Sequence, residues 1–289
     1  MPARRFFYLS VVAACLILLG CTSTPPTPAP VQYFADAKKN LDSLDYEAAL
    51  KNLDRMIAAA GDQPIGQQGI VLRTALLTAL AEGTKQMAET YGEGMKKPPA
   101  QARQAQFVRM RSDYYGICRV RLLSAMESGM KQRTKLGDKA MELQVNFPGF
   151  TGTQHPAISR IRDGYWVEDA ERYRAELESV RNALARTLAR LVGAGDDVHE
   201  GRTMFEKGSV QIAPAVYLFE LSTTFRRLSE IFERRGLDDA SYRRTCLEVV
   251  RDNLDATLKL LQAKPDKELE ARAKKLKEES EKTLKSLSQ

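Results

Sequence analysis

Apolar residues recur at spacings of three and four along most of the chain after residue 31. This spacing places them on one face of an α-helix, whereas a half-buried strand alternates apolar and polar residues. No convincing alternating run is joined to another by a hairpin turn. The pattern therefore predicts an all-α fold of antiparallel helix pairs, arranged either as a stacked solenoid or as an irregular helical bundle.

The first predicted helical region covers residues 32–146. Helix breaks are expected at Ser43–Asp45, at Gly83 and at the two prolines of residues 98–99. The helices expected in this region span residues 32–42, 46–60, 70–81, 84–95, 101–135 and 138–145.

The second predicted helical region covers residues 147–264 and follows a segment, 146–156, whose prolines and glycines break the helical pattern. Asp238 or Asp239 is expected to cap its last helix. The elements expected here are helices over 173–191, 217–232 and 242–261, with a polar loop over 195–208. Residues 265–289 are highly charged and are predicted to form a C-terminal helix stabilised by ion pairs between residues four apart.

The N-terminus has the zones of an export signal. Arg4 and Arg5 precede an apolar run over residues 6–19, which is shorter than the roughly 20 apolar residues that a transmembrane helix needs. We interpret residues 1–20 as a signal peptide that is removed from the mature chain. The expected signal ends with Leu18, Leu19 and Gly20, and Cys21 is the expected first residue of the mature chain.

These four residues resemble the lipobox of bacterial lipoproteins, which has an aliphatic first residue, a small third residue and a Cys in fourth place. Leu19 departs from the family's preference for Ala or Ser. The resemblance implies a diacylglycerol on the Cys21 sulfur and an N-acyl chain such as palmitate on its amine, which together anchor the chain in a membrane. An ordinary secretory signal followed by a chance Cys is the alternative.

Residues 21–31 form the expected tether between the lipid and the helical body. This segment contains four prolines and three threonines, and proline disfavours helix in the residue before it. The tether is therefore predicted to be semi-extended. Thr22 follows the Cys where lipoproteins kept at the inner membrane of enteric bacteria carry Asp. This resemblance implies a place in the cell envelope on the periplasmic face of the outer membrane.

Residues 33–64 resemble a tetratricopeptide repeat (TPR), a pair of short helices with small residues at their crossing. The matching positions are Tyr33, Ala37, Leu41, Tyr46, Ala49 and Leu53. In such a repeat the two alanines let the backbones approach, and the larger side chains fill the space beside them. Asp36 stands where the family prefers Leu, and the closing proline comes late, at Pro64.

Residues 72–99 resemble the same repeat less closely, with Gly92 in place of a bulky residue. The order of lipidated Cys, proline-rich tether and helical hairpin also resembles two kinds of lipoprotein in layout. One is the helical-repeat lipoprotein of the outer-membrane barrel-assembly machinery, and the other is the helical lipoprotein paired with tripartite periplasmic transporters. These layouts imply a protein-binding scaffold or a component of a transport system.

The charge is nearly balanced along the chain. With 44 Lys and Arg against 37 Asp and Glu, the formal net charge is +7, and the two signs are interspersed. A mildly basic surface of this kind is unlike a nucleic-acid-binding stripe, so we expect no nucleic-acid partner.

Cys118 and Cys246 fall on apolar helix stripes and are predicted to be buried free thiols. A disulfide between them is the alternative in an oxidising compartment.

Few residues of the chain are suited to catalysis. His155 and His199 are the only histidines, and His155 is expected in a solvated loop. The acidic segment 196–200 around His199 is interpreted as a helix-capping loop rather than a metal site, because no Cys or second His accompanies it. No glycine-rich phosphate loop follows a predicted strand. We therefore expect no metal, no bound cofactor and no enzymatic activity.

Four aromatic residues near the break between the two helical regions are candidate partner-binding residues, because exposed aromatics often anchor partners. They are Phe147, Phe150, Tyr165 and Trp166. Alternatively, they fill the junction between the two regions.

The sequence thus predicts an outer-membrane-anchored, non-catalytic scaffold that binds a protein segment in a groove. A small-ligand-binding lipoprotein with a cavity in its helical body, or a transport component, is the alternative. A purely structural cell-envelope protein is a third possibility.

Overall fold

The structure is a computed structural model that describes residues 29–137 and 139–287. Its regular secondary structure is almost entirely helical, which confirms the predicted all-α class. The helices are α2 (Pro30–Asp42), α3 (Tyr46–Ala60), α4 (Pro64–Gly94), η1 (Pro98–Arg103), α5 (Gln104–Arg133), α6 (Pro156–Arg162), α7 (Asp169–Leu191), α8 (Val198–Glu206), α9 (Pro214–Leu228), η2 (Ser229–Phe232), α10 (Ala240–Ala263) and α11 (Lys267–Ser286). The short strands among the described residues are β1 (Met141–Leu143) and β2 (Val210–Ile212).

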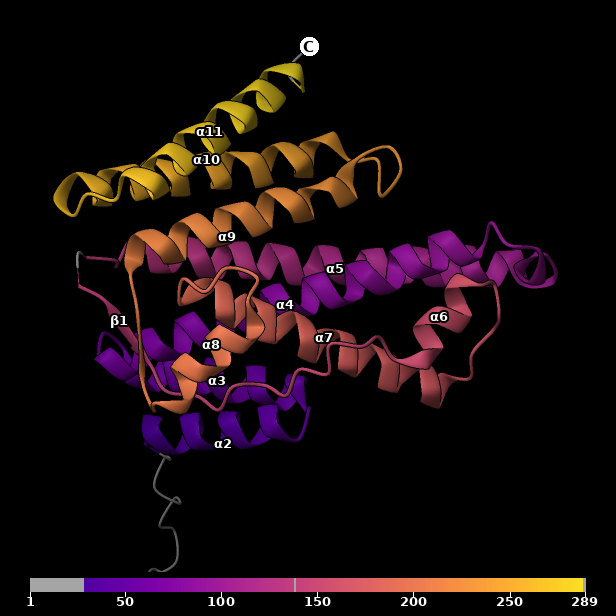
Figure 1. The fold of residues 1–289 in the computed structure, drawn as a ribbon, viewed down its shortest axis with the longest axis horizontal. Helices are drawn as coiled ribbons and strands as arrows, with labels where there is room; N and C mark the ends of the chain where they lie inside the picture. Colours follow the sequence, from indigo (N-terminus) through magenta and orange to yellow (C-terminus); the bar gives the residue numbers. More distant parts are fainter. Residues whose placement is uncertain (1–28, 138, 288–289) are drawn as a thin grey trace, which may run out of the picture.

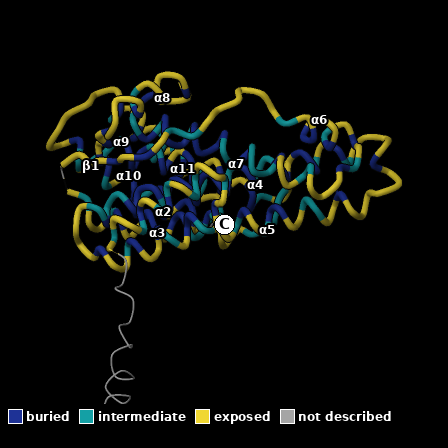
Figure 2. Tube along the Cα trace, turned by 90° about the horizontal axis from the view of Figure 1, so that it is seen from below, coloured by how far each residue is buried: buried dark blue, intermediate teal, exposed yellow. Residues whose placement is uncertain are grey.

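The helices are stacked in layers around the long pair α4 and α5 (Figure 1). The hairpin of α2 and α3 packs on one side of this pair, and α7 packs along α4. Helices α9, α10 and α11 lie one above another on the far side of α5 (Figure 1). Buried positions gather between these layers, whereas the segment that leads to α6 is mostly exposed (Figure 2).

Helix α4 is the central element and is buried on most sides, so its apolar residues do not form a single stripe. Its buried threonines need hydrogen-bond partners because water does not reach them. The hydroxyls of Thr74, Thr78 and Thr84 donate to carbonyl oxygens four residues earlier, at 2.8, 2.8 and 2.7 Å. Each hydroxyl is therefore satisfied within the helix, and the helix can be buried without a polar face.

The expected helix break at Gly83 is wrong, because α4 runs through this residue without interruption. A Cβ atom at position 83 would lie 2.7 Å from Cγ2 of Val180 and 3.0 Å from its Cα. Glycine at this position lets the backbone of α7 cross α4 at close range. Residues 72–94, which resemble a second repeat, consequently lie in one helix and not in a helical hairpin.

The helix expected over 138–145 is also wrong, and the described part of this segment contains β1 instead. Its residues pair antiparallel with β2, with Met141 opposite Ile212 and Leu143 opposite Val210. The side chains of β1 alternate between buried and exposed, as a strand with one face on the core requires. The pairing partner lies about 70 residues further along the chain, so local sequence does not reveal it.

The polar loop expected over 195–208 contains helix α8. The carboxylate of Asp197 accepts hydrogen bonds from the backbone N–H groups of His199 and Glu200, each at 2.9 Å. These bonds satisfy two of the free N–H groups at the start of a helix. The helix-capping interpretation of this acidic segment is therefore confirmed.

Most of the residues expected to pack between the two helices of the first hairpin are buried. Ala37, Ala49 and Leu53 have no exposed surface, and Tyr46 is 5% exposed. The buried aromatic of α2 is Phe34, however, and the expected Tyr33 is only partly buried. A helix places adjacent residues about 100° apart, so a shift of one residue changes which ring faces the core.

A continuous hydrophobic core joins the two predicted helical regions, since α4 packs against α7 and α5 packs against α9 and α10.

Cys118 and Cys246 are both buried and free. The prediction of buried free thiols is therefore confirmed, and the alternative of a disulfide is not. The predicted C-terminal helix is confirmed as α11, with i,i+4 ion pairs from Lys274 to Glu270 and from Lys277 to Glu281. None of the described helices is sufficiently long and apolar to traverse a bilayer.

Candidate functional site

The predicted lipidation site lies outside the described residues, and so do the other three residues of the lipobox. These residues are Leu18, Leu19, Gly20 and Cys21. The first described helix, α2, begins nine positions after Cys21. The lipid anchor and its chemistry therefore remain predictions from the sequence.

The four candidate aromatics do not form one surface. Trp166 packs against Phe107 and Tyr91 at ring-centroid distances of 6.0 and 6.5 Å, at the end of the α4–α5 pair. Phe147 lies in the linker between β1 and α6, where its ring is 5.4 Å from that of Phe205 in α8. These two rings belong to the packed body, as the junction-filling alternative expected.

The other two candidate aromatics are exposed. The side chain of Phe150 is 42% exposed and that of Tyr165 is 55% exposed. They lie on either side of α6 along the chain and have no ring contact with each other among the described residues. Phe147, in contrast, lines a cleft together with residues of the α2–α3 hairpin.

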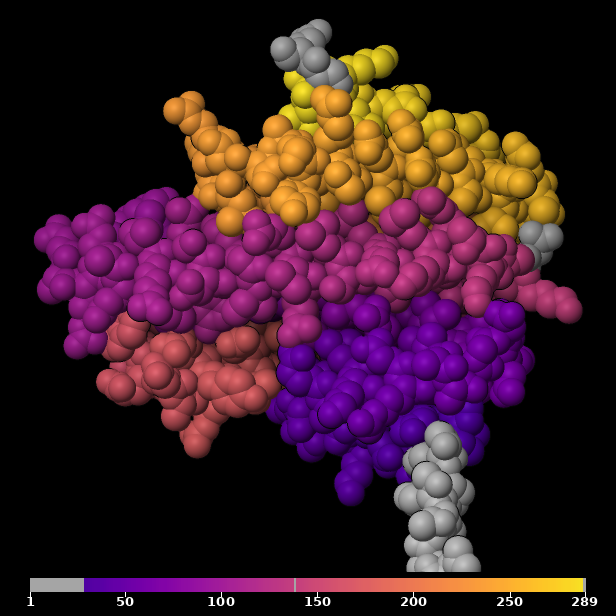
Figure 3. Space-filling view, turned by 180° about the vertical axis from the view of Figure 1, so that it is seen from behind, coloured from indigo at the N-terminus to yellow at the C-terminus, as the bar shows by residue number. Residues whose placement is uncertain are grey.

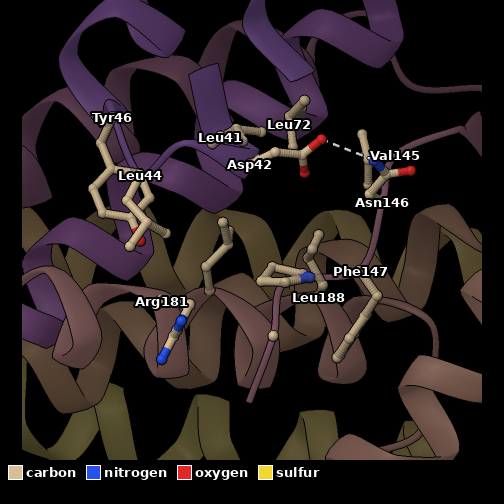
Figure 4. Close-up of a pocket in the computed structure, with 13 residues that line it drawn as sticks. Leu41, Asp42, Leu44, Tyr46, Leu72, Val145, Asn146, Phe147, Arg181 and Leu188 are labelled. Carbon is tan, nitrogen blue, oxygen red and sulfur yellow. Dashed lines mark hydrogen bonds between the residues drawn. The ribbon is translucent and has the colours of Figure 1, made fainter. Parts of the chain in front are cut away.

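This cleft, which we call the hairpin cleft, lies between the turn that joins α2 to α3, the linker after β1, and α7 (Figure 4). It has a volume of about 180 Å³. Its lining is mainly apolar and comprises Leu41, Asp42, Leu44, Tyr46, Leu72, Val145, Asn146, Phe147, Pro148, Gly149, Arg181, Leu184 and Leu188.

Leu44 has an unusual backbone conformation at the edge of the cleft. Its φ angle is +62°, in the left-handed region, which costs a residue with a Cβ roughly 1–2 kcal/mol. The turn closes like a Schellman motif, because the N–H of Asp45 donates to the carbonyl of Asn40 at 2.9 Å and that of Leu44 to Leu41 at 3.1 Å. Glycine is usual at this position of the motif because it has no Cβ. This chain has Leu44 there instead, and its apolar side chain lines the cleft.

Two hydrogen bonds hold the walls of the cleft together. The Tyr46 hydroxyl donates to the carbonyl of Leu177 in α7 at 3.2 Å. Asn146 Nδ2 donates to the Asp42 carboxylate at 2.9 Å, which ties the linker to the end of α2 (Figure 4). Burial raises the pKa of Tyr46 well above its ordinary value, in opposition to the charge of Arg181. The tyrosine therefore stays neutral and keeps its proton for the bond to α7.

Arg181 is the one cation among the residues that line this cleft. Its Nε atom is buried and has no hydrogen-bond partner among the described residues, and its Nη2 lies 4.0 Å from Glu178 Oε2. Buried donors are usually satisfied. This donor, in contrast, is unused among the described residues.

Neither histidine belongs to a cluster of potential metal ligands among the described residues. His155, expected in a solvated loop, is partly buried, and its Nδ1 accepts the backbone N–H of Ala157 at 3.2 Å to cap α6. His199 is exposed on α8. Within residues 29–137 and 139–287, no group of three His, Cys, Asp or Glu side chains could hold a metal ion.

Of the residues that line the hairpin cleft, the sequence marked only Phe147 as a candidate partner-binding residue. Leu41 and Tyr46 were expected only as packing positions of the first hairpin, and Leu44 and Arg181 were not predicted as site residues. A helix break without glycine at Ser43–Asp45 is the one local signal that some residue there adopts a left-handed conformation. Arg181 lies on a helix rich in arginine, and only the fold distinguishes it from its neighbours. Comparison with known proteins found no matching family model, no matching curated protein and no matching solved structure.

Proposed function

We propose that this protein is a lipoprotein anchored through Cys21 to the periplasmic face of the outer membrane, and that its helical body is a non-catalytic scaffold. The scaffold binds an apolar segment of a protein partner in the hairpin cleft. Two or more acyl chains make such an anchor stable, since each buried CH₂ contributes about 0.8 kcal/mol. No nucleic acid takes part.

The observation that carries the binding proposal is the strained Leu44 at the edge of an apolar cleft. Backbone strain persists where function benefits from it, and here it presents an aliphatic side chain beside Phe147. The cleft volume of about 180 Å³ is below the roughly 300–1,000 Å³ of typical small-molecule sites. It is suited to anchoring apolar side chains of a peptide.

The anchor is tested by replacing Cys21 with Ser in the full chain. The variant is expected to leave the membrane fraction of cells, because no thiol is present to receive the lipid. A variant that still partitions with membranes as the native chain does would contradict the lipoprotein assignment.

The cleft is tested by photocrosslinking in intact cells, with benzoylphenylalanine at position 147. Position 108 on α5 is the control, because Val108 is 50% exposed and lies outside the cleft. A defined protein adduct is expected from position 147 and not from position 108. Leu44→Asn is then combined with the crosslinker, since Asn tolerates the left-handed backbone but removes the apolar surface. It should lower the adduct yield while the thermal unfolding of the chain stays close to that of the parent.

An adduct that forms equally from both positions, or that does not respond to Leu44→Asn, would refute the cleft as the binding site.

A second candidate function is ligand binding within a transport system, and one observation favours it. An apolar pocket of about 320 Å³ lies where α9 begins and where α10 meets α11, lined by residues such as Val216, Leu261 and Leu269. This volume falls at the lower end of the range for small-molecule sites. Native mass spectrometry of the purified chain would detect a bound apolar ligand, and Val216→Trp, which fills the pocket, should abolish that signal. Detection of such a ligand would favour this candidate over the scaffold.

A further inference from the structure

Four cations line an open groove at the opposite end of α4 from the α2–α3 hairpin. They are Lys96 after α4, Arg111 on α5, and Arg234 and Arg235 in the turn that follows η2. The groove has a volume of about 640 Å³. We call it the basic groove; in Figure 3 the turn that contains its two adjacent arginines lies above α5 at the left of the view.

The positive charge of the basic groove is not neutralised within the described chain. Among the described residues, no carboxylate lies within ion-pair distance of the four cations. Two carboxylates also line the groove, but each is already paired with a cation outside it. Glu89 accepts from Lys85 at 2.6 Å, and Glu93 Oε2 is 2.9 Å from Arg162 Nε. The groove is therefore a site of excess positive charge, and such a site attracts anions.

Arg111 is held in place before any ligand binds. Arg111 stacks on the ring of Tyr115, with its guanidinium carbon 5.2 Å from the ring centroid, and its Nη2 donates to the carbonyl oxygen of Arg235. Gly92 makes room for this side chain, because a Cβ there would lie 3.1 Å from Arg111 Nε.

The turn that carries the other two arginines is also closely packed. A Cβ at Gly236 would lie 2.0 Å from the carbonyl oxygen of Ile231, so only glycine fits there without a change in the backbone. The N–H of Leu237 also donates to that carbonyl oxygen, at 2.7 Å. Ordered backbone on both sides of the groove reduces the entropy lost when a ligand binds.

We propose that the basic groove binds a phosphate monoester, carried either on a lipid headgroup or on a soluble molecule. A carboxylate carries one charge, whereas a phosphate monoester carries about −1.5 to −2 at pH 7 and offers three acceptor oxygens. Guanidinium groups donate to phosphate oxygens in a planar fork, which makes Arg the preferred residue for such groups. Three arginines and a lysine therefore match the charge and acceptor number of a monoester better than those of a carboxylate. This site is separate from the hairpin cleft and does not rest on the proposed function.

The test is calorimetric titration of the full chain in non-ionic detergent at low salt. Dihexanoyl phosphatidic acid is the lipid-borne monoester, glycerol phosphate is the soluble one, and dihexanoyl phosphatidylcholine is the uncharged control. The variant R234Q/R235Q removes two exposed cations of the groove. The matched control K51Q/R55Q removes two exposed cations of α3, so the net charge falls equally in both variants.

R234Q/R235Q should bind the monoester about tenfold more weakly or worse, since two guanidinium groups that donate charge-assisted hydrogen bonds to the phosphate are lost. K51Q/R55Q should stay within about twofold of the native chain, because distant charges are screened. Circular dichroism melts verify that both variants are folded. If both monoesters bind, and R234Q/R235Q weakens binding more than K51Q/R55Q does, the site is supported and a soluble source is indicated. If phosphatidic acid alone binds in this way, the site is supported and a lipid source is indicated.

Absence of monoester binding overturns the proposal, and so does equal weakening by the two variants. Either result leaves the hairpin cleft unaffected, because crosslinking at position 147 is measured independently.

Discussion

Burial determines the chemistry of the two cysteines in the helical body. Cys118 Sγ lies 3.2 Å from the carbonyl oxygen of Ala81, and Cys246 Sγ lies 3.4 Å from the sulfur of Met126. Burial raises the pKa of each thiol to about 12. Because the thiolate is the reactive form, both residues should be inert at neutral pH.

Iodoacetamide at neutral pH should therefore leave Cys118 and Cys246 unlabelled in the native chain and label both in urea. Peptide mass spectrometry distinguishes these two sites from Cys21. Labelling of either thiol under native conditions, or recovery of the two peptides as a disulfide, would contradict the structure.

Glu176 in α7 is a partly buried carboxylate whose environment disfavours its charge. Burial raises its pKa, against a hydrogen bond from the Tyr114 hydroxyl at 3.1 Å and the charge of Arg172. A group with a raised pKa contributes stability that is fully present below its unfolded-state pKa. That contribution is lost as the pH rises through the higher pKa of the folded state.

Glu176→Gln should consequently unfold at higher urea concentration than the native chain at pH 7, with the advantage shrinking as the pH falls toward 4. Gln keeps an acceptor for Tyr114 and removes the buried charge. Glu142→Gln on the exposed face of β1 is the control and should show no such dependence. A Glu176→Gln advantage that is equal at both pH values would disprove the burial argument.

Glycines within helices have opposite roles in different elements of this fold. Gly83 is where α7 crosses α4, and an added Cβ would meet both side-chain and backbone atoms of Val180. Gly116 in α5 has nothing within 4 Å of the position a Cβ would occupy. The same residue type is therefore required for packing in one helix and only weakens the other.

Gly83→Ala should destabilise the protein by about 1–3 kcal/mol, the usual cost of overpacking a core. Gly116→Ala should stabilise it by about 0.5–1 kcal/mol, because alanine is the better helix former. Urea unfolding measures both changes. If the two substitutions shift stability in the same direction, the assigned crossing of α4 and α7 is incorrect.

Burial is distributed unevenly over the whole molecule. Most residues of α4 are buried, whereas α11 buries only Leu269, Ala273 and Ser280. Helices with few buried contacts open more readily than the core does. The stack of layers should therefore open from its α11 edge (Figure 1).

Native-state hydrogen exchange should show α4 amides as the most protected and α11 amides as the least protected of the long helices. Mass spectrometry of peptides from α4, α10 and α11 resolves this order. Protection of α11 equal to that of α4 would mean that α11 unfolds only with the whole molecule.

Much of the secondary structure follows from sequence alone because helical periodicity is a local property. The turn at Ser43–Asp45, the cap at Asp239 and helix α11 were all predictable from residues close in sequence. Helical periodicity predicted burial less well at the ends of the helices. Tyr173 and Tyr242 are the first apolar residues of two predicted helices, yet they are 59% and 37% exposed.

Sequence by itself determined the all-α class, the acidic cap before α10 and the charged C-terminal helix, since each depends on a short contiguous pattern. Tertiary structure decided that Gly83 continues α4, that β1 pairs with β2, and that Leu44 and Arg181 share a cleft. It also brought Arg111 beside Arg235, which follows it by 124 positions. Such features depend on which distant segments pack together, and a local pattern of apolar and polar residues carries no record of the partner.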